Sequence, residues 1–153
     1  MQLDLRSHLG APQRSVRPDV VPTRPAYLRD VDQVEDELRR LEAQHPGRAK
    51  LVDLGDSSRK EHDAARGHDI LGLVLGTRAD DPAVPRVLFT AGVHADEAAN
   101  GATLLEWAKR TLDGAAAGDP ARRALLDERT VVVMPMVNPD GLDVVVDGLA
   151  KGD

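Results

Sequence analysis

A histidine and a glutamate, His94 and Glu97, are separated by two residues and directly follow the apolar segment "RVLFTA" (residues 86–91). An imidazole nitrogen and a carboxylate oxygen each bind zinc at about 2.0 to 2.2 Å. At this spacing, across a strand-to-helix turn, both side chains can converge on one ion. The motif by itself leaves two interpretations open, half of a metal site or an ordinary polar turn, because Glu is common and the chain has five histidines.

The surrounding pattern predicts a strand before His94 and a helix after Glu97. The continuous apolar run of residues 86–91 is typical of a strand buried on both faces. A helix from about residue 97 to residue 112 is indicated by apolar side chains at helical spacing, namely Leu104, Leu105, Ala108 and Leu112. Ligands of open α/β sheets bind at the carboxyl ends of strands, so the position of the pair favours a functional site.

Three further apolar runs predict strands, at residues 50–55, 69–76 and 130–137. The polar stretch between the first two carries His62 and His68 and is predicted to be a hairpin loop. An amphipathic helix is expected to begin after Asp30 and to stop before Pro46-Gly47. The order strand, helix, strand in the second half implies a right-handed crossover and a parallel pair.

Composition limits the class of protein. The chain has 153 residues with 41% hydrophobic and 30% charged side chains, which predicts one globular core. Its net charge of −6, with no basic stripe, argues against nucleic acid as a partner. There is no cysteine, so any metal must be bound by His, Asp or Glu.

The first 26 residues contain four prolines and scattered charges, and they are predicted to form an irregular arm that precedes a domain at residues 27–153. They lack the apolar centre of a secretory signal, and no segment reaches the length of a membrane span. We therefore expect a cytoplasmic protein without a membrane partner.

A second motif, "VVVMPMVNPDG", ends the last predicted strand with Asn138-Pro139-Asp140-Gly141. Pro fixes φ, Asp tolerates a turn and Gly permits positive φ, so the residues by themselves predict a turn.

Together, "FTAGVHADEAANGATLLEWA" and "VVVMPMVNPDG" resemble the N-terminal half of the zinc carboxypeptidases, the M14 metallopeptidases, over roughly residues 27–147. The resemblance implies an α/β fold of the phosphorylase/hydrolase-like type, with a mixed, largely parallel sheet flanked by helices and incomplete in this chain. It also implies that His94 and Glu97 hold one Zn²⁺, as part of the His₂Glu ligand set of carboxypeptidase A. The implied activity is that of a hydrolase, a metalloprotease that cleaves the C-terminal bond of a peptide or a related small amide.

The remaining functional positions of the family have no counterpart in this chain. No histidine follows His94, and the resemblance places the third ligand, a histidine, and the general-base glutamate beyond residue 153. The catalytic and substrate-binding residues of this chain are therefore unknown. We interpret the chain as an N-terminal piece of a longer enzyme, inactive by itself. In the alternative, His62 or His68 completes an unusual site.

The predicted number of strands has a consequence for association. A sheet that stops after the fourth strand has an unpaired edge and an uncovered apolar face, which invites self-association. Two alternative functions also stay open. One is a zinc acylase of the aspartoacylase or succinylglutamate desuccinylase type, and the other is a non-catalytic binding module that retains the fold.

Overall fold

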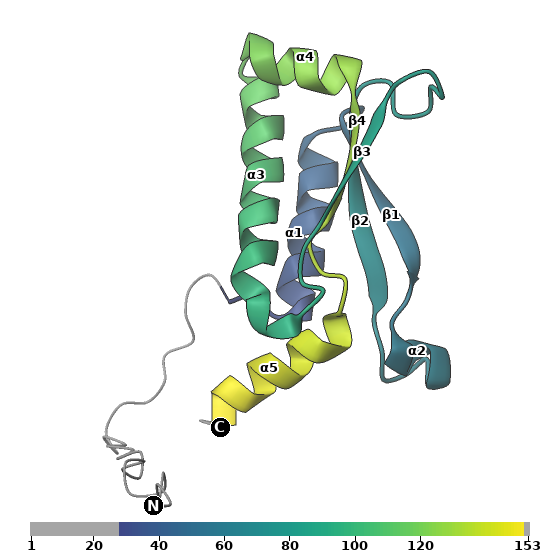
Figure 1. Ribbon diagram of the computed structural model, residues 1–153. Coiled ribbons are helices and arrows are strands. Elements are labelled where there is room, and N and C mark those ends of the chain that lie inside the picture. The colour runs from purple at the N-terminus through teal and green to yellow at the C-terminus, as the bar shows by residue number, and fades with distance from the viewer. Residues whose placement is uncertain (1–27, 152–153) are drawn as a thin grey trace, which may run out of the picture.

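The computed structural model describes residues 28–151 (Figure 1). The arm predicted for residues 1–26 lies outside the described residues. None of the helices in the described part has the length and apolar character that a bilayer crossing requires.

Four strands form one mixed sheet in the order β1-β2-β4-β3. Their bounds are Ala49–Asp56 for β1, Asp69–Leu75 for β2, Arg86–Thr90 for β3 and Thr130–Met134 for β4. The pairs β1/β2 and β2/β4 are antiparallel, and β3/β4 is parallel. The mixed α/β sheet that the resemblance implies is confirmed, as is the parallel pair expected from the crossover. The resemblance implies a largely parallel sheet, whereas two of the three strand pairs in the described part are antiparallel.

Two long helices, α1 (Val31–Gln44) and α3 (Ala98–Ala116), pack side by side on one face of this sheet (Figure 1). The capping box predicted for α1 is present, because Asp30 and Gln33 exchange side-chain to backbone hydrogen bonds. The core lies between these helices and the sheet and consists of aliphatic side chains, among them Leu38, Leu41, Leu73, Leu75, Leu105, Leu112 and Val133.

Shorter helices occupy the connections. The polar hairpin loop contains α2 (Ser58–His62), the turn after β3 contains the 3₁₀ helix η2 (Ala95–Glu97), and α4 (Pro120–Glu128) leads into β4. The last described element is α5 (Pro139–Lys151). The sequence interpretation assigned residues 130–137 to a strand, but β4 ends at Met134 and an irregular segment leads from it to α5.

The prediction that β3 is buried on both faces is wrong. All five of its residues are exposed, and the side chain at its centre, Leu88, is 57% exposed. The reason is its place at the sheet edge, where it has one neighbour, on a sheet whose other face carries no helix of the described chain (Figure 1). Within residues 28–151, the unpaired edge and the uncovered apolar face expected from the sequence are therefore both present.

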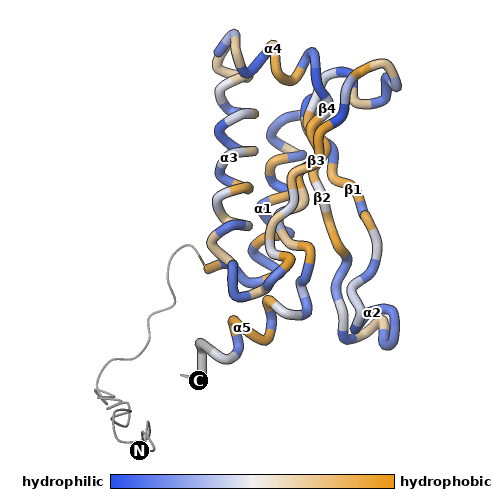
Figure 2. The backbone as a smooth tube through the Cα atoms, viewed as in Figure 1, coloured by the Kyte–Doolittle hydropathy of each residue, from blue (hydrophilic) through white to orange (hydrophobic). Residues whose placement is uncertain are grey.

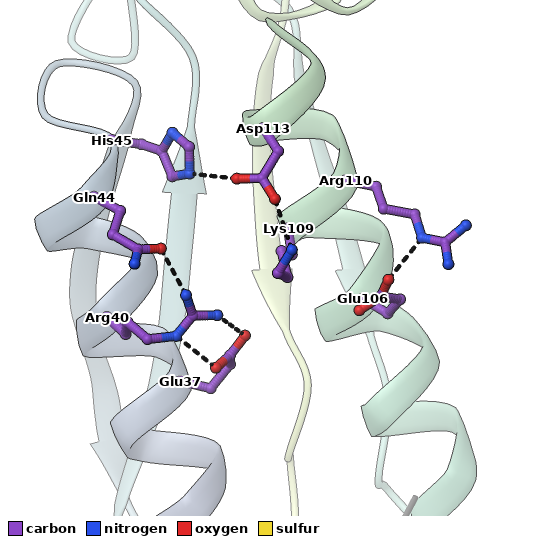
Figure 3. Close-up of polar contacts among 8 residues, drawn as sticks. All are labelled: Glu37, Arg40, Gln44, His45, Glu106, Lys109, Arg110 and Asp113. Carbon is purple, nitrogen blue, oxygen red and sulfur yellow. Dashed lines mark hydrogen bonds and ion pairs between the residues drawn. The ribbon is translucent and has the colours of Figure 1, made fainter. Parts of the chain in front are cut away.

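A polar network joins the C-terminal end of α1 to the C-terminal half of α3 (Figure 3). His45, only 7% exposed, places its Nε2 atom 3.1 Å from the Oδ1 atom of Asp113. Lys109 donates to the other oxygen of the same carboxylate at 2.7 Å. The hydrogen bond and positive charge of Lys109, with a smaller effect of His45, hold the pKa of Asp113 below its usual value.

Truncation of a core side chain between α3 and the sheet is expected to destabilise the fold strongly. Leu112 is fully buried, so Leu112→Ala should lower the free energy of unfolding by about 2–5 kcal/mol. The matched control is Val144→Ala at a side chain that is 60% exposed, where the change should stay within about 0.5 kcal/mol. Chemical denaturation measures both, and equal losses would contradict the described core.

The α1–α3 network predicts a pH dependence of stability. Because the pKa of Asp113 is lowered in the folded state, its carboxylate stabilises the fold above the unfolded pKa, and this contribution is lost as the pH falls through the lowered folded value. Asp113→Asn removes the effect, so the wild type should lose more stability than the variant between about pH 5 and pH 3. The difference should stay below about 1 kcal/mol, because the side chain is 45% exposed. Parallel pH profiles in thermal unfolding would contradict the prediction.

Candidate metal centre

The two predicted ligands lie on the turn that joins β3 to α3. After β3 the chain bends at Gly92, whose φ of 65° lies in the left-handed region that favours glycine. His94 follows in an extended conformation and precedes η2, and the backbone N–H of Glu97 donates to the carbonyl of His94 at 3.1 Å. The turn therefore places both side chains beyond the carboxyl end of β3.

Their side chains face each other in solvent. The Nδ1 atom of His94 lies 3.8 Å from the Oε1 atom of Glu97, and the side chains are 74% and 53% exposed. Two donors bound to one tetrahedral zinc ion at about 2.1 Å are about 3.4 Å apart, so the observed separation fits a shared ion after a small adjustment. Asn100 donates to the second carboxylate oxygen of Glu97 at 3.3 Å and orients it. The residues fit zinc chemically, and their role as ligands stays a prediction.

Within residues 28–151, no group of three His, Asp or Glu side chains has the geometry of a metal site. His62 directs its Nδ1 atom to the carbonyl of Ser58 at 2.7 Å, within its own helix. His68 pairs with Asp143 of α5 at 2.7 Å, and its side chain is only 22% exposed. The alternative in which His62 or His68 completes the site therefore finds no support in this part of the chain.

The Asn138–Gly141 motif is the start of a helix and not only a turn. Asn138 accepts a hydrogen bond on its Oδ1 atom from the N–H of Gly141 at 2.9 Å, and Pro139 occupies the first helical position. The sequence held this signal, since Asn before Pro is a common way to begin a helix. The interpretation as a simple turn overlooked it.

The Asn138–Gly141 motif also holds in place the turn of residues 91–97, which carries both predicted ligands and is called the ligand turn below. The N–H groups of Val137 and Asn138 donate to the carbonyls of Ala91 and Gly92, each at 3.0 Å. These two hydrogen bonds attach the segment before α5 to the residues that immediately precede His94.

A close approach between α5 and η2 adds to this attachment. A Cβ atom placed on Gly141 would lie 2.8 Å from the Cβ of Ala95, the residue that directly follows His94. On the other side of the motif, Asp140 accepts a hydrogen bond from the N–H of Arg59 in α2 at 2.8 Å. Sequence reasoning singled out the Asn138–Gly141 motif but did not predict these contacts, because they connect segments far apart in the chain.

The structural neighbours define the class of this fold. The chain superimposes on carboxypeptidase A from Helicoverpa armigera with a TM-score of 0.65 at 20% identity, covering 82% of this chain and 28% of that one. A metallo-carboxypeptidase from Burkholderia cenocepacia matches with a TM-score of 0.57 at 29% identity, over 75% of this chain and 29% of that one. The described residues thus have part of a carboxypeptidase-like α/β fold.

The sequence comparison identifies the family. Residues 34–148 match the zinc carboxypeptidase family, the M14 peptidases. A zinc carboxypeptidase of Saccharothrix mutabilis subsp. capreolus is 35% identical over 111 residues, which cover 70% of this chain and 23% of that protein. The chain belongs to the zinc carboxypeptidase family, and it spans less than a third of the length of these relatives.

The close approach of α5 to η2 predicts that alanine substitutions at two glycines of α5 change stability in opposite directions. Gly141→Ala should lower the free energy of unfolding by about 1–3 kcal/mol, because the new methyl group meets Ala95 and the capping side chain of Asn138. At Gly148 a Cβ meets nothing within 4 Å, so Gly148→Ala should stabilise the helix by up to about 1 kcal/mol. Thermal unfolding measures both changes. A neutral Gly141→Ala variant would show that α5 does not press against the ligand turn.

Proposed function

We propose that this protein carries part of the zinc centre of a metallocarboxypeptidase, in which His94 and Glu97 bind the ion. The observation that carries the proposal is the juxtaposition of these two side chains, 3.8 Å apart at the carboxyl edge of the sheet, inside the segment that matches the family. The proposed reaction is hydrolysis of the C-terminal peptide bond of a peptide, or of a related small amide.

The chemistry fits this donor pair. A bound zinc ion would polarise a carbonyl and lower the pKa of water toward 7, which makes hydrolysis possible at neutral pH. Glu97 precedes the first residue of α3, where the positive end of the helix dipole favours a carboxylate. Asn100 donates a hydrogen bond to the Oε2 atom of Glu97, which limits rotation of the carboxylate. The Oε1 atom is left facing His94, where an ion could bind between them.

The described residues supply only part of what a peptidase needs. A catalytic zinc site has three protein ligands and one open position, and residues 28–151 contain no group of three suitable side chains. In our proposal a third ligand and a general base come from polypeptide outside these residues. The 153-residue chain is accordingly proposed to bind zinc weakly and to hydrolyse no peptide.

Zinc titration of the 153-residue chain tests the proposed ligands. We expect about one ion per chain with a dissociation constant above about 1 µM, because two ligands yield far less than the roughly 10–16 kcal/mol of complete structural sites. His94→Ala and Glu97→Gln should each weaken binding about tenfold or more, measured by calorimetry at matched pH.

His62→Ala is the matched control, since this histidine is also exposed but engages its own helix. Its zinc affinity should equal that of the wild type. Zinc binding that persists in the His94→Ala/Glu97→Gln double variant would refute the site. Peptidase turnover by the wild type that disappears in His94→Ala would refute only the proposed inactivity.

A further inference from the structure

Two glycines, one on each side of the predicted ligands, lie against the same carbonyl group. Gly92 precedes the ligands, and Gly101 follows Glu97 by four residues in α3. A Cβ atom on Gly92 would lie 3.3 Å from the carbonyl oxygen of Pro135, and one on Gly101 would lie only 2.5 Å from the same oxygen. The peptide group of Pro135 therefore contacts the chain both before and after the ligand pair.

The backbone at Pro135 is restrained by hydrogen bonds on either side of it. The carbonyl of Met134 accepts from the N–H of Ala91 at 2.9 Å, and the N–H of Val137 donates to the carbonyl of Ala91 at 3.0 Å. The oxygen that faces Gly101 belongs to this restrained backbone, so it cannot turn aside as the end of a side chain does. The close contact with α3 thus depends on the absence of a side chain at Gly101.

Gly101 belongs to the buried face of α3. Figure 2 shows hydrophilic and hydrophobic residues alternating along this helix, and its buried residues recur at helical spacing from Gly101 through Leu105, Ala108 and Leu112. A glycine inside a helix costs stability relative to alanine, because it has more conformational freedom to lose. The approach of Pro135 is a physical reason for glycine at this position.

A second glycine of α3 provides the contrast. A Cβ atom on Gly114 would meet the Cδ atom of Arg122. That atom is part of a long side chain that is 43% exposed and can adopt another rotamer. Alanine at Gly114 is therefore tolerated, whereas alanine at Gly101 would displace α3 from the segment around Pro135.

A displacement at Gly101 acts directly on Glu97. Residues four apart lie on the same face of a helix, one turn from each other. Glu97 is the N-cap residue of α3, and its Oε1 atom lies 3.8 Å from the Nδ1 atom of His94. Two donors bound to one zinc ion are about 3.4 Å apart, so any further separation of the two side chains would weaken the binding of a shared ion.

We propose that Gly101 is a positioning residue of the metal centre. Because it has no side chain, the first turn of α3 lies against the Pro135 carbonyl, and this contact sets the distance from Glu97 to His94. The inference rests on the proposed function, since it assigns the contact to the support of the two predicted ligands. Gly101 acts through Glu97 and does not itself bind the ion.

Zinc titration of the 153-residue chain with Gly101→Ala tests this role, with Gly114→Ala as the matched control. Both variants add the same methyl group to the same helix. Gly101→Ala should weaken zinc binding about tenfold, the lower end of the effect of losing the outer support of a metal ligand. Gly114→Ala should retain the wild-type affinity in calorimetry at matched pH. Equal affinities of the two variants would overturn the positioning role.

A double-mutant cycle separates positioning from a general structural defect. If Gly101 acts by placing the carboxylate of Glu97, Gly101→Ala should weaken zinc binding little further in a Glu97→Gln background. The remaining binding is followed through the ring resonances of His94. A loss in this background as large as in the wild type would show general damage to the site, and would contradict a role in placing Glu97.

A measurement on the wild type does not depend on the folding of any variant. The carbonyl ¹³C resonance of Pro135 should shift when zinc binds, because movement of Glu97 toward the ion changes the contact of α3 with this group. The resonances of Gly114 should stay constant. An unchanged Pro135 signal at zinc saturation would refute the positioning role alone. Zinc that stays bound in the His94→Ala/Glu97→Gln double variant would refute the proposed function and the positioning role together.

Discussion

Two backbone hydrogen bonds continue the pairing of β3 with β4 beyond the ends of both strands. They run from the N–H groups of Val137 and Asn138 to the carbonyls of Ala91 and Gly92. Backbone hydrogen bonds of this kind do not depend on side-chain rotamers, so they fix the path of the chain on both sides at once. The turn that carries His94 and the start of α5 are consequently parts of one structural unit.

This attachment explains why the two sequence motifs belong together. The loop before His94 is short and contains a glycine in the left-handed region, so by itself it would have considerable freedom. Asn138 removes much of that freedom through its backbone N–H while its side chain begins α5. Gly141 then allows α5 to approach Ala95, which directly follows His94. The motif at Asn138–Gly141 fixes the position of the turn, and the turn itself carries the predicted donor atoms of His94 and Glu97.

The sheet is strongly asymmetric, and this asymmetry governs what the chain can do. One face is covered by α1 and α3 and forms an aliphatic core, while no helix within residues 28–151 covers the other face. The predicted metal donors, His94 and Glu97, follow the end of β3. Glu97 also lines an open pocket between β3 and α3.

Local patterns in the sequence determined the elements and the donor pair. Helical spacing and the Asp30 capping box defined α1, apolar runs defined the strands, and the interval between His94 and Glu97 predicted that their side chains meet. These features depend on neighbours a few residues apart, which a sequence displays directly. Only the tertiary structure decided that β3 is an exposed edge strand, that His68 pairs with Asp143, and that Asn138 holds the ligand turn. Each of these features depends on which distant segments become neighbours. An apolar run has the same sequence pattern whether one or both faces of its strand are covered, so the pattern could not predict that β3 is exposed.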